Sequence, residues 1–152
     1  MKKRQFMGKR EIREFLEKIS ENYGEIDADK VEFAEHEESI IYILDDKIEL
    51  IKNEELIFPF LGGSIVERLP SVTVDMGAIR FVCNGADIMA PGITDLDDFC
   101  KDDVVVVRDK THGKALAVGV AHKSSEEIKS LKKGKVIGSL HYVGDDLWES
   151  LS

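Results

Sequence analysis

The spacing of the apolar residues changes once along the chain, near residue 30. Before that point, four apolar residues recur at intervals of three and four positions: Ile12, Phe15, Leu16 and Ile19. This spacing predicts one helix over about residues 9–22, with Gly24 as its terminator. Beyond it, short apolar runs rich in β-branched residues alternate with turn residues, a pattern typical of strands. The sequence therefore predicts an opening helix followed mostly by strands.

The first half of the chain predicts a small antiparallel sheet beside this helix. Three runs of apolar and β-branched residues are expected to be its strands: residues 31–34, 39–44 and 48–51. The apolar run 56–61 contains Pro59, which restricts it to the edge of a sheet because proline donates no ladder hydrogen bond. The glycine pair at 62–63 and Pro70 then predict a domain boundary. We expect residues 1–70 to form an α+β domain and residues 71–152 a second domain.

The second half opens with a strand and a short helix. Residues 72–74 are a β-branched run, and Asp75 is a candidate N-cap whose carboxylate can accept the first free amides of a helix. Three residues then give a helix of about two turns one apolar edge: Ile79, Val82 and Cys83. Asn84-Gly85 ends it, since glycine can take the left-handed conformation that closes a helix.

Two further elements follow this helix directly. Residues 86–90 predict a second strand. Pro91-Gly92 fits a type II turn, because proline fixes φ at its first central position and glycine accepts positive φ at its second. An acidic loop is expected over residues 94–103, at the surface except for Leu96 and Phe99.

The remaining pattern is strand-rich. Apolar runs predict three strands, over residues 104–107, 115–121 and 135–142. A turn at 110–113 joins the first two, and Ser124 caps a short helix before the third. Leu147 and Trp148, in a closing turn, are expected to plug the end of the barrel. Short strands with a few inserted helices fit a compact mixed barrel, so the whole chain is predicted to be α+β.

Charge gives an ambiguous picture of the partners. The formal net charge of −9 argues against a nucleic-acid binder. Basic residues are nevertheless clustered, six of them within residues 1–13 and eight between 108 and 135, and local patches set the potential that a phosphate meets. Residues 1–8, a basic leader, are expected to be poorly ordered. No apolar run approaches the ~20 residues of a membrane helix, and we expect a cytoplasmic protein.

Catalytic and metal chemistry find no support in the residue pattern. Cys83 and Cys100 have no metal-ligand spacing and are expected to be buried structural residues, and the four histidines are scattered. Cys83 with a histidine base is conceivable as a nucleophile, but packing explains it better. Pairs of aspartates fall at turns, where local hydrogen bonds favour them. We predict no catalytic residues, no metal site and no cofactor.

The segment that ends in Asn84-Gly85 carries a resemblance. Continued by Ala-x-Ile-Met-x-Pro-Gly-Ile, it resembles the opening of a PUA domain, an RNA-binding module. Two longer motifs are similar to the malignant T-cell amplified sequence proteins and their archaeal relatives: Thr73-Val-Asp-x-Gly-Ala-Ile-Arg-Phe-Val, and Ile137-Gly-x-x-His-Tyr-x-x-Asp-Asp-Leu-Trp148. The resemblance covers residues 71–149 well. It implies a PUA-type mixed β-barrel after a small N-terminal pre-PUA domain.

The resemblance implies a cleft for RNA between the first helix of the PUA domain, the next strand and the last strand. The matching positions are Arg80, Asn84, Gly85, Ala86, Asp87 and Met89, with Pro91 and Gly92 shaping the turn. Charge and expected proximity to the cleft add phosphate contacts at Lys114, His122 and Lys123. From the residues alone, Gly85 is better explained as a helix terminator, and the resemblance shifts this toward an RNA contact. Asp87 brings a negative charge, so it is expected to accept from a base amino group or a ribose hydroxyl.

Aromatic residues for base stacking are few. Tyr142 is one candidate, whereas Phe81, Phe99 and Trp148 are expected in the core.

The resemblance also implies a role and partners. Similar proteins act at the small ribosomal subunit in initiation, reinitiation or recycling, where the PUA domain holds a tRNA 3′ end. The N-terminal domain docks on ribosomal RNA, for which the basic leader is the candidate: Lys2, Lys3, Arg4, Lys9, Arg10 and Arg13. In eukaryotic relatives a protein with an initiation-factor-like domain binds that part. The alternative is an accessory RNA-binding protein for RNA modification or ribosome assembly.

Overall fold

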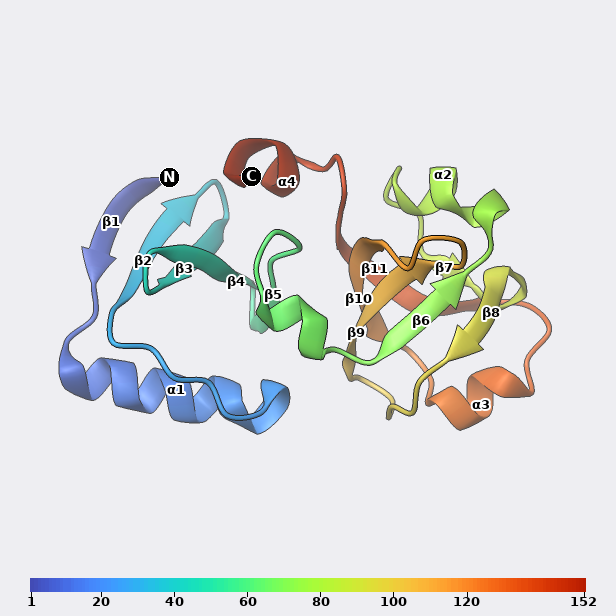
Figure 1. Ribbon diagram of the computed structural model, residues 1–152, viewed down its shortest axis with the longest axis horizontal. Helices are drawn as coiled ribbons and strands as arrows, with labels where there is room; N and C mark the ends of the chain where they lie inside the picture. The colour runs from blue at the N-terminus through green and yellow to red at the C-terminus, as the bar shows by residue number, and fades with distance from the viewer. The chain divides into compact units, whose positions relative to one another are not determined.

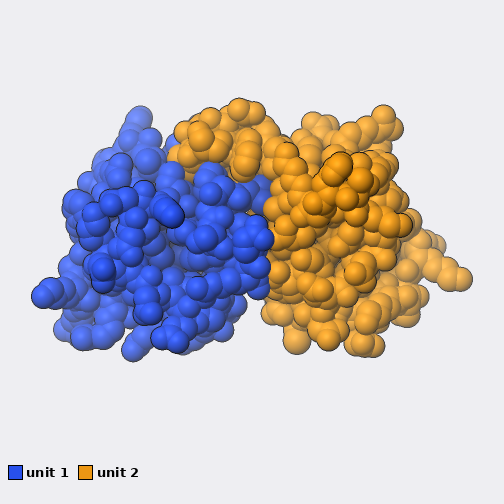
Figure 2. Space-filling view, in the orientation of Figure 1, with its two compact units in different colours: residues 1–68 blue, residues 69–152 orange.

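A computed structural model describes residues 1–152 and divides the chain into two units, Met1–Arg68 (unit 1) and Leu69–Ser152 (unit 2), as Figure 2 shows. Each unit has its own sheet and its own buried side chains. None of the helices combines the length and the apolar character needed to cross a bilayer.

Unit 1 joins one helix to a five-stranded antiparallel sheet (Figure 1). The helix is α1 (Lys9–Tyr23), and the strands are hydrogen-bonded in sequence order: β1 (Lys2–Phe6), β2 (Val31–His36), β3 (Ser39–Leu44), β4 (Lys47–Asn53) and β5 (Leu56–Pro59). A 3₁₀ helix, η1 (Ile65–Arg68), ends the unit. The three predicted strands are confirmed, and Pro59 lies on an edge strand as expected.

The helix predicted over residues 9–22 is confirmed. Its apolar stripe packs on the sheet, where the rings of Phe15 and Tyr42 are 4.5 Å apart between centroids. The Tyr23 hydroxyl donates to the Ile57 carbonyl of β5, and burial raises the pKa of this phenol. Gly24 ends the helix with φ 80° and donates its N–H to the Ser20 carbonyl.

The N-terminal leader is a strand, so the expectation that residues 1–8 are poorly ordered is wrong. β1 pairs antiparallel with β2, with Gln5 opposite Phe33. The Arg4 guanidinium lies 2.8 Å from a carboxylate oxygen of Glu32, which is buried. The strand has no buried side chain of its own, so its order comes from partners about thirty residues away, which its own pattern does not reveal.

Glu49 of β4 fixes the segment that follows β5. Its buried carboxylate accepts hydrogen bonds from the Ser64 amide (2.7 Å), the Ser64 hydroxyl (2.7 Å) and the Ile65 amide (3.1 Å). A Cβ on Gly63 would lie 2.4 Å from the same carboxylate. A Cβ on Gly62 would lie 2.5 Å from the Phe60 ring, so close packing requires both glycines that mark the end of the apolar run.

Unit 2 is a six-stranded mixed sheet that curls into a nearly closed barrel (Figure 1). Its strand order is β7 (Ile88–Met89), β11 (Lys135–Tyr142), β10 (Ala115–Ala121), β9 (Val104–Asp109), β6 (Ser71–Val74) and β8 (Ile93–Leu96). Only β6 and β9 pair in parallel. Short helices are inserted between the strands: η2 (Met76–Ala78), α2 (Ile79–Val82), η3 (Ala90–Gly92), α3 (Ser125–Lys129) and α4 (Asp146–Leu151). The α+β prediction is confirmed.

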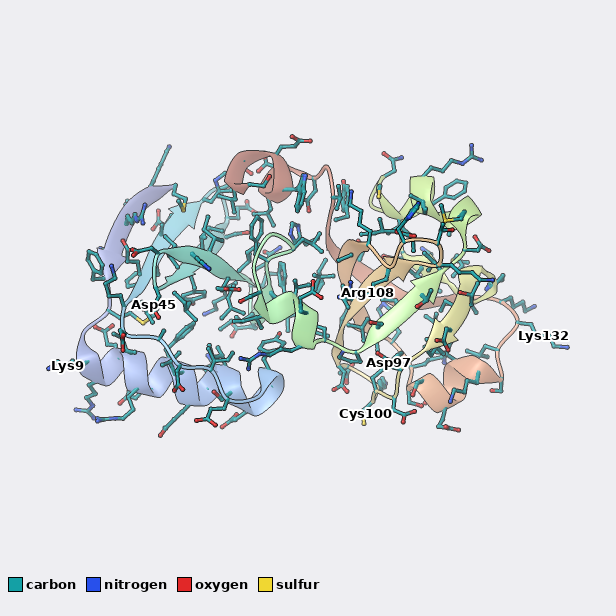
Figure 3. All side chains as sticks on the ribbon, viewed as in Figure 1. Lys9, Asp45, Asp97, Cys100, Arg108 and Lys132 are labelled. Carbon is teal, nitrogen blue, oxygen red and sulfur yellow. The ribbon has the colours of Figure 1, made fainter.

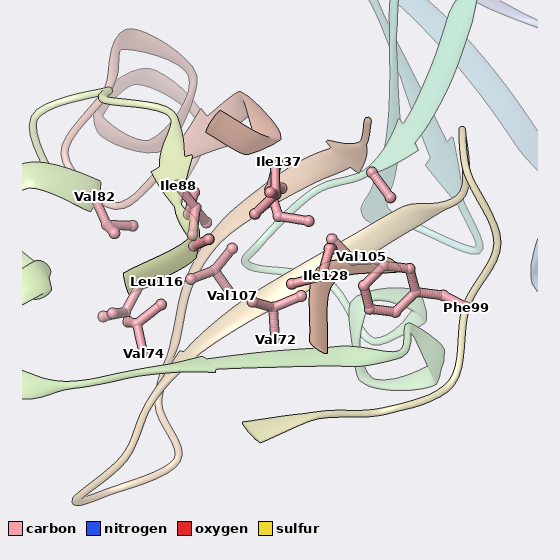
Figure 4. Close-up of a cluster of buried hydrophobic side chains, with 14 residues drawn as sticks. Val72, Val74, Val82, Ile88, Phe99, Val105, Val107, Leu116, Ile128 and Ile137 are labelled. Carbon is pink, nitrogen blue, oxygen red and sulfur yellow. The ribbon is translucent and has the colours of Figure 1, made fainter. Parts of the chain in front are cut away.

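The interior of unit 2 is filled by strand side chains. Val72, Val107, Leu116 and Ile137 come from four different strands and point toward one another (Figure 4). Small residues on β10 allow this approach, since a Cβ on Gly119 would lie 2.6 Å from the Ile137 side chain. The predicted strands at 104–107, 115–121 and 135–142 are confirmed.

Two expectations around the acidic loop and the barrel end need correction. Residues 93–96 form β8, which pairs with β6, because the free edge of β6 offers them a ladder; Phe99 is buried as expected. Leu147 and Trp148 are partly exposed and outside the buried cluster, so the predicted plug is wrong. Strand side chains, Phe99 and Ile128 already fill the interior.

The segment after α2 also differs from its prediction. The strand expected over residues 86–90 is reduced to Ile88 and Met89, the only residues of the segment with ladder partners on β11. Ala90–Gly92 form a 3₁₀ turn instead of a type II turn, and Gly92 is not among the glycines with positive φ.

Candidate nucleic-acid interface

A cleft of about 630 Å³ opens in unit 2 between η2 and α2 on one side and β7, η3 and the start of β11 on the other. This volume is in the range of small-molecule sites, about 300–1,000 Å³. Its lining residues are Asp75, Gly77, Ala78, Phe81, Val82, Ala86, Asp87, Ile88, Met89, Pro91, Gly92 and Lys135. Most of them are apolar, and two are acidic.

Local hydrogen bonds give the cleft its shape. Asp75 caps η2 as predicted, since its Oδ1 accepts from the Ala78 amide at 3.0 Å. The Asp75 amide donates to the Gly92 carbonyl at 3.0 Å and ties η3 to the end of β6. Gly85 has φ 88°, the left-handed conformation expected of it, and the following Ala86 amide turns back to the Phe81 carbonyl at 3.0 Å. The two walls are thus held by backbone bonds.

The mouth of the cleft carries exposed apolar side chains. Phe81 is 54% exposed and Met89 44% exposed, and both line the cleft. The Arg80 guanidinium lies over the Phe81 ring, 4.8 Å from its centroid. The expectation that Phe81 belongs to the core is wrong, because α2 is so short that only Val82 is buried and Phe81 projects from another side.

Asp87 and Lys135 supply the polar edge of the cleft. Asp87 Oδ1 accepts from the Ser139 amide of β11 at 2.9 Å. Its Oδ2 lies 4.0 Å from the Lys135 ammonium, and the two side chains are 36% and 70% exposed. Lys135 was not among the predicted residues, although the basic run 132–135 before the last strand is a usable signal; its register partner on β7 is Met89.

Five of the predicted RNA contacts line the cleft: Ala86, Asp87, Met89, Pro91 and Gly92. The other predicted contacts lie outside it: Arg80, Asn84, Gly85, Lys114, His122 and Lys123. The backbone at Gly85 is not bare, since a Cβ there would lie 2.9 Å from the Tyr142 ring. Packing against Tyr142 accounts for this glycine, and an RNA contact at Gly85 stays a prediction.

The basic residues outside the cleft have separate surroundings. Burial raises the pKa of the Cys83 thiol, and the positive charge of Lys114 opposes this increase. A raised pKa disfavours the thiolate, so Cys83 has the environment of a packing residue, and it contacts the core. The His122 ring lies against Gly138, whose Cβ would be 2.5 Å from Nε2.

Only some of the aspartates predicted at turns make the local hydrogen bonds expected of them. Asp103 and Asp145 accept from amides three residues away, those of Cys100 and Trp148. Asp45 instead accepts from the amides of Asp29 and Lys30, and Asp97 from the Ser71 amide at 2.7 Å, all distant in the chain. Figure 3 shows Asp45 and Asp97 near loops. Cys100 is exposed, so the expectation that this cysteine is buried is wrong. These carboxylates and this cysteine form no common site.

Ion pairs occupy half of the basic leader. Lys3 pairs with Glu35 (3.7 Å), Arg4 with Glu32 (2.8 Å) and Arg10 with Glu14 (3.1 Å). The hydrogen bond to Glu32 raises the pKa of Arg4. Lys9 and Arg13 line a groove along α1 that also contains four acidic residues: Glu17, Glu21, Glu25 and Asp27. The leader is therefore less positive than its sequence indicates.

Two family models match the chain in succession. The domain of unknown function DUF1947 matches residues 3–62, and the PUA domain matches residues 70–143.

Curated relatives span both parts. An uncharacterized protein of Methanocaldococcus jannaschii is 40% identical over 157 aligned positions, covering 97% of this chain and 96% of that protein. Translation machinery-associated protein 20 of Saccharomyces cerevisiae is 37% identical over 129 positions, which cover 78% of this chain and 71% of that protein. Human malignant T-cell-amplified sequence 2 is 43% identical over 84 positions, which is 53% of this chain and 46% of that protein.

Solved structures share the fold. A hypothetical protein of Pyrococcus horikoshii has a TM-score of 0.85 and 30% identity, and a conserved PUA domain protein of Thermoplasma acidophilum has 0.79 and 27%; each covers 98% of this chain and 99% of that one. A chain of an H/ACA ribonucleoprotein bound to a substrate RNA has a TM-score of 0.51 and 28% sequence identity. The match covers 60% of this chain and 28% of that chain. The chain belongs to the family of PUA-domain proteins that includes translation machinery-associated protein 20 and the malignant T-cell-amplified sequence proteins, with a DUF1947 domain before its PUA domain.

Proposed function

We propose that this protein is a non-enzymatic RNA-binding protein of the translation machinery that holds an unpaired RNA end in the cleft of unit 2. The observation that carries this proposal is the exposure of Phe81 and Met89 beside Lys135 in a cleft lined mostly by apolar residues. Aromatic side chains stack on unpaired bases of any sequence, and a nearby ammonium group can meet the phosphate. The fold offers both in one place.

The comparisons support the class of partner. The relatives named translation machinery-associated protein place this family with protein synthesis, and an H/ACA ribonucleoprotein contains a related fold in an RNA complex. In this proposal the RNA is a tRNA 3′ end, the site of action is the small ribosomal subunit in the cytoplasm, and the step is initiation, reinitiation or recycling.

Unit 1 takes a docking role in this proposal. Its leader contacts ribosomal RNA through the basic residues that no described ion pair engages: Lys2, Lys9 and Arg13. A protein with an initiation-factor-like domain is the partner proposed for the same unit. Because the net charge of the chain is −9, affinity for RNA is expected to be modest and to fall steeply with salt.

The H/ACA match favours one second candidate, an accessory RNA-binding role in RNA modification or ribosome assembly. It uses the same cleft with another RNA. Cosedimentation with immature ribosomal particles, in place of initiating small subunits, would support this second role.

The test compares deacylated tRNA with and without its 3′-terminal CCA. We expect binding to require the single-stranded end, and Phe81→Ala to weaken it about tenfold because one stacked base is worth about 1–3 kcal/mol. Phe6→Ala is the matched control, since Phe6 is 66% exposed in unit 1. Both substitutions remove an exposed ring, so the fold is expected to persist. Equal binding of both tRNAs, unaffected by Phe81→Ala, would contradict the proposal.

A further inference from the structure

In each of the two carboxylates that line the cleft, one oxygen accepts a hydrogen bond from a backbone amide. Asp87 Oδ1 accepts from the Ser139 amide at 2.9 Å, and Asp75 Oδ1 accepts from the Ala78 amide at 3.0 Å. The second oxygen of Asp87 has only Lys135 nearby, at 4.0 Å, and no hydrogen bond within the protein reaches the second oxygen of Asp75. Each carboxylate is thus held in place and retains acceptor capacity.

We propose that the cleft selects unpaired bases by their exocyclic amino groups and binds cytosine in preference to uracil. This inference rests on the proposed function. An ionised carboxylate can only accept hydrogen bonds. The two bases differ at position 4, where cytosine presents an N4 amino donor and uracil the O4 acceptor, and at N3, where cytosine accepts and uracil donates. The cytosine amino group offers two N–H donors to fixed carboxylates, whereas the single N3–H of uracil lies between O4 and O2, which an ionised carboxylate repels.

The apolar side chains of the cleft do not distinguish cytosine from uracil, so the discrimination depends on the carboxylates. Phe81 and Met89 contact a base through its face, and stacking tolerates every base. Lys135 is the sole side-chain donor in the lining that could meet the O4 of uracil. Its side chain is 70% exposed, so fixing it there costs rotamer entropy, whereas Asp87 is already held by Ser139.

The experiment measures binding of two RNA hexamers, all cytidine and all uridine, to the full chain at one low salt concentration by fluorescence anisotropy. We expect the cytidine hexamer to bind about tenfold more tightly, the effect of one hydrogen bond to a charged group. In Asp87→Asn the amide oxygen can still accept from Ser139, and the amide nitrogen brings a donor to the cleft. The preference is expected to fall to parity or to invert toward uridine.

Asp98→Asn is the matched control, because Asp98 is exposed in a loop outside the cleft and the substitution makes the same change in charge. It is expected to leave the ratio of the two affinities unchanged. Equal binding of both hexamers that still depends on Phe81 would overturn the selectivity and leave the proposed function intact. No binding of either hexamer would overturn both. An equal change of the ratio in the Asp87 and Asp98 variants would overturn the assignment to the cleft.

Discussion

Glu49 in unit 1 and Asp87 in unit 2 both accept hydrogen bonds from backbone amides, but in different surroundings. Glu49 is 6% exposed, and its oxygens accept three hydrogen bonds from Ser64 and Ile65. The Asp87 side chain is 36% exposed, accepts one bond from Ser139 and turns its other oxygen toward a cleft. A carboxylate whose oxygens are both hydrogen-bonded within the protein, as in Glu49, has a structural role. A carboxylate with one oxygen free of such bonds, as in Asp87, is a candidate for contact with a ligand.

The basic residues of the two units show the same contrast. Arg4 is engaged by the buried Glu32 and thereby holds β1 on the sheet. Arg80 lies over the exposed Phe81 ring, and Lys135 stands 4.0 Å from Asp87. Some basic residues of unit 1, such as Arg4, are paired with acidic neighbours, whereas the Lys135 side chain lines the cleft and is 70% exposed. The number of basic residues in a stretch of sequence therefore does not predict which of them contact RNA.

The largest expected effect is the difference in protein stability between substitutions of Glu49 and of Asp87. Glu49→Ala leaves the buried Ile65 amide and the amide and hydroxyl of Ser64 without their acceptor, and we expect it to lower the free energy of unfolding by about 3 kcal/mol. Asp87→Ala removes one acceptor at a half-exposed position and is expected to cost about 1 kcal/mol. Urea denaturation followed by circular dichroism measures both. A larger loss for Asp87→Ala than for Glu49→Ala would break the comparison.

Asp145 is an intermediate case and gives a prediction in pH. Burial raises its pKa, but hydrogen bonds from His141, Trp148 and Tyr142 outweigh this, and the net pKa is lowered. A carboxyl whose pKa is lower when folded stabilises the fold above its unfolded pKa of about 3.9, and this stability is lost as the pH falls through the folded value.

The substitution that tests this is Asp145→Asn. At pH 6 it is expected to cost about 1 kcal/mol, because the half-buried site screens the charge, and the difference from the unmodified protein is expected to shrink below about pH 4. Thermal unfolding between pH 2.5 and 6 measures both curves. Asp98→Asn, an exposed loop position, is the control. Parallel curves for the Asp145 variant would contradict the assigned role.

How much the sequence foretold depends on whether a residue's partner lies nearby in the chain. Helix α1, the strands of the barrel and the caps at Asp75 and Gly24 were predictable, because their signals are local spacing and local hydrogen bonds. The strand β1 was missed because its partners are about thirty residues away. Gly85 was assigned a bare backbone because the Tyr142 ring above it comes from the last strand.

The cleft follows the same rule. The basic run 132–135 is a sequence signal, but only the pairing of β7 with β11, which places Lys135 opposite Met89, shows which of its lysines lies at the cleft. The exposure of Phe81 depends on α2 having a single turn, which apolar spacing did not resolve. Membership of the PUA family was nevertheless legible, because its motif is contiguous in the chain.

The smallest expected effect concerns the charge of Lys135. It tests whether the Lys135 ammonium group contacts RNA or instead neutralises the Asp87 carboxylate. If Lys135 meets RNA phosphate, Lys135→Gln should reduce the slope of log affinity against log salt by about 0.7, the value for one contact on a single strand. Lys101→Gln, exposed and outside the cleft, should leave the slope unchanged. Titrating tRNA at several salt concentrations measures both. An unchanged slope in Lys135→Gln would mean that Lys135 neutralises Asp87, and Asp87 would then resemble Glu49 as a carboxylate satisfied by its own protein.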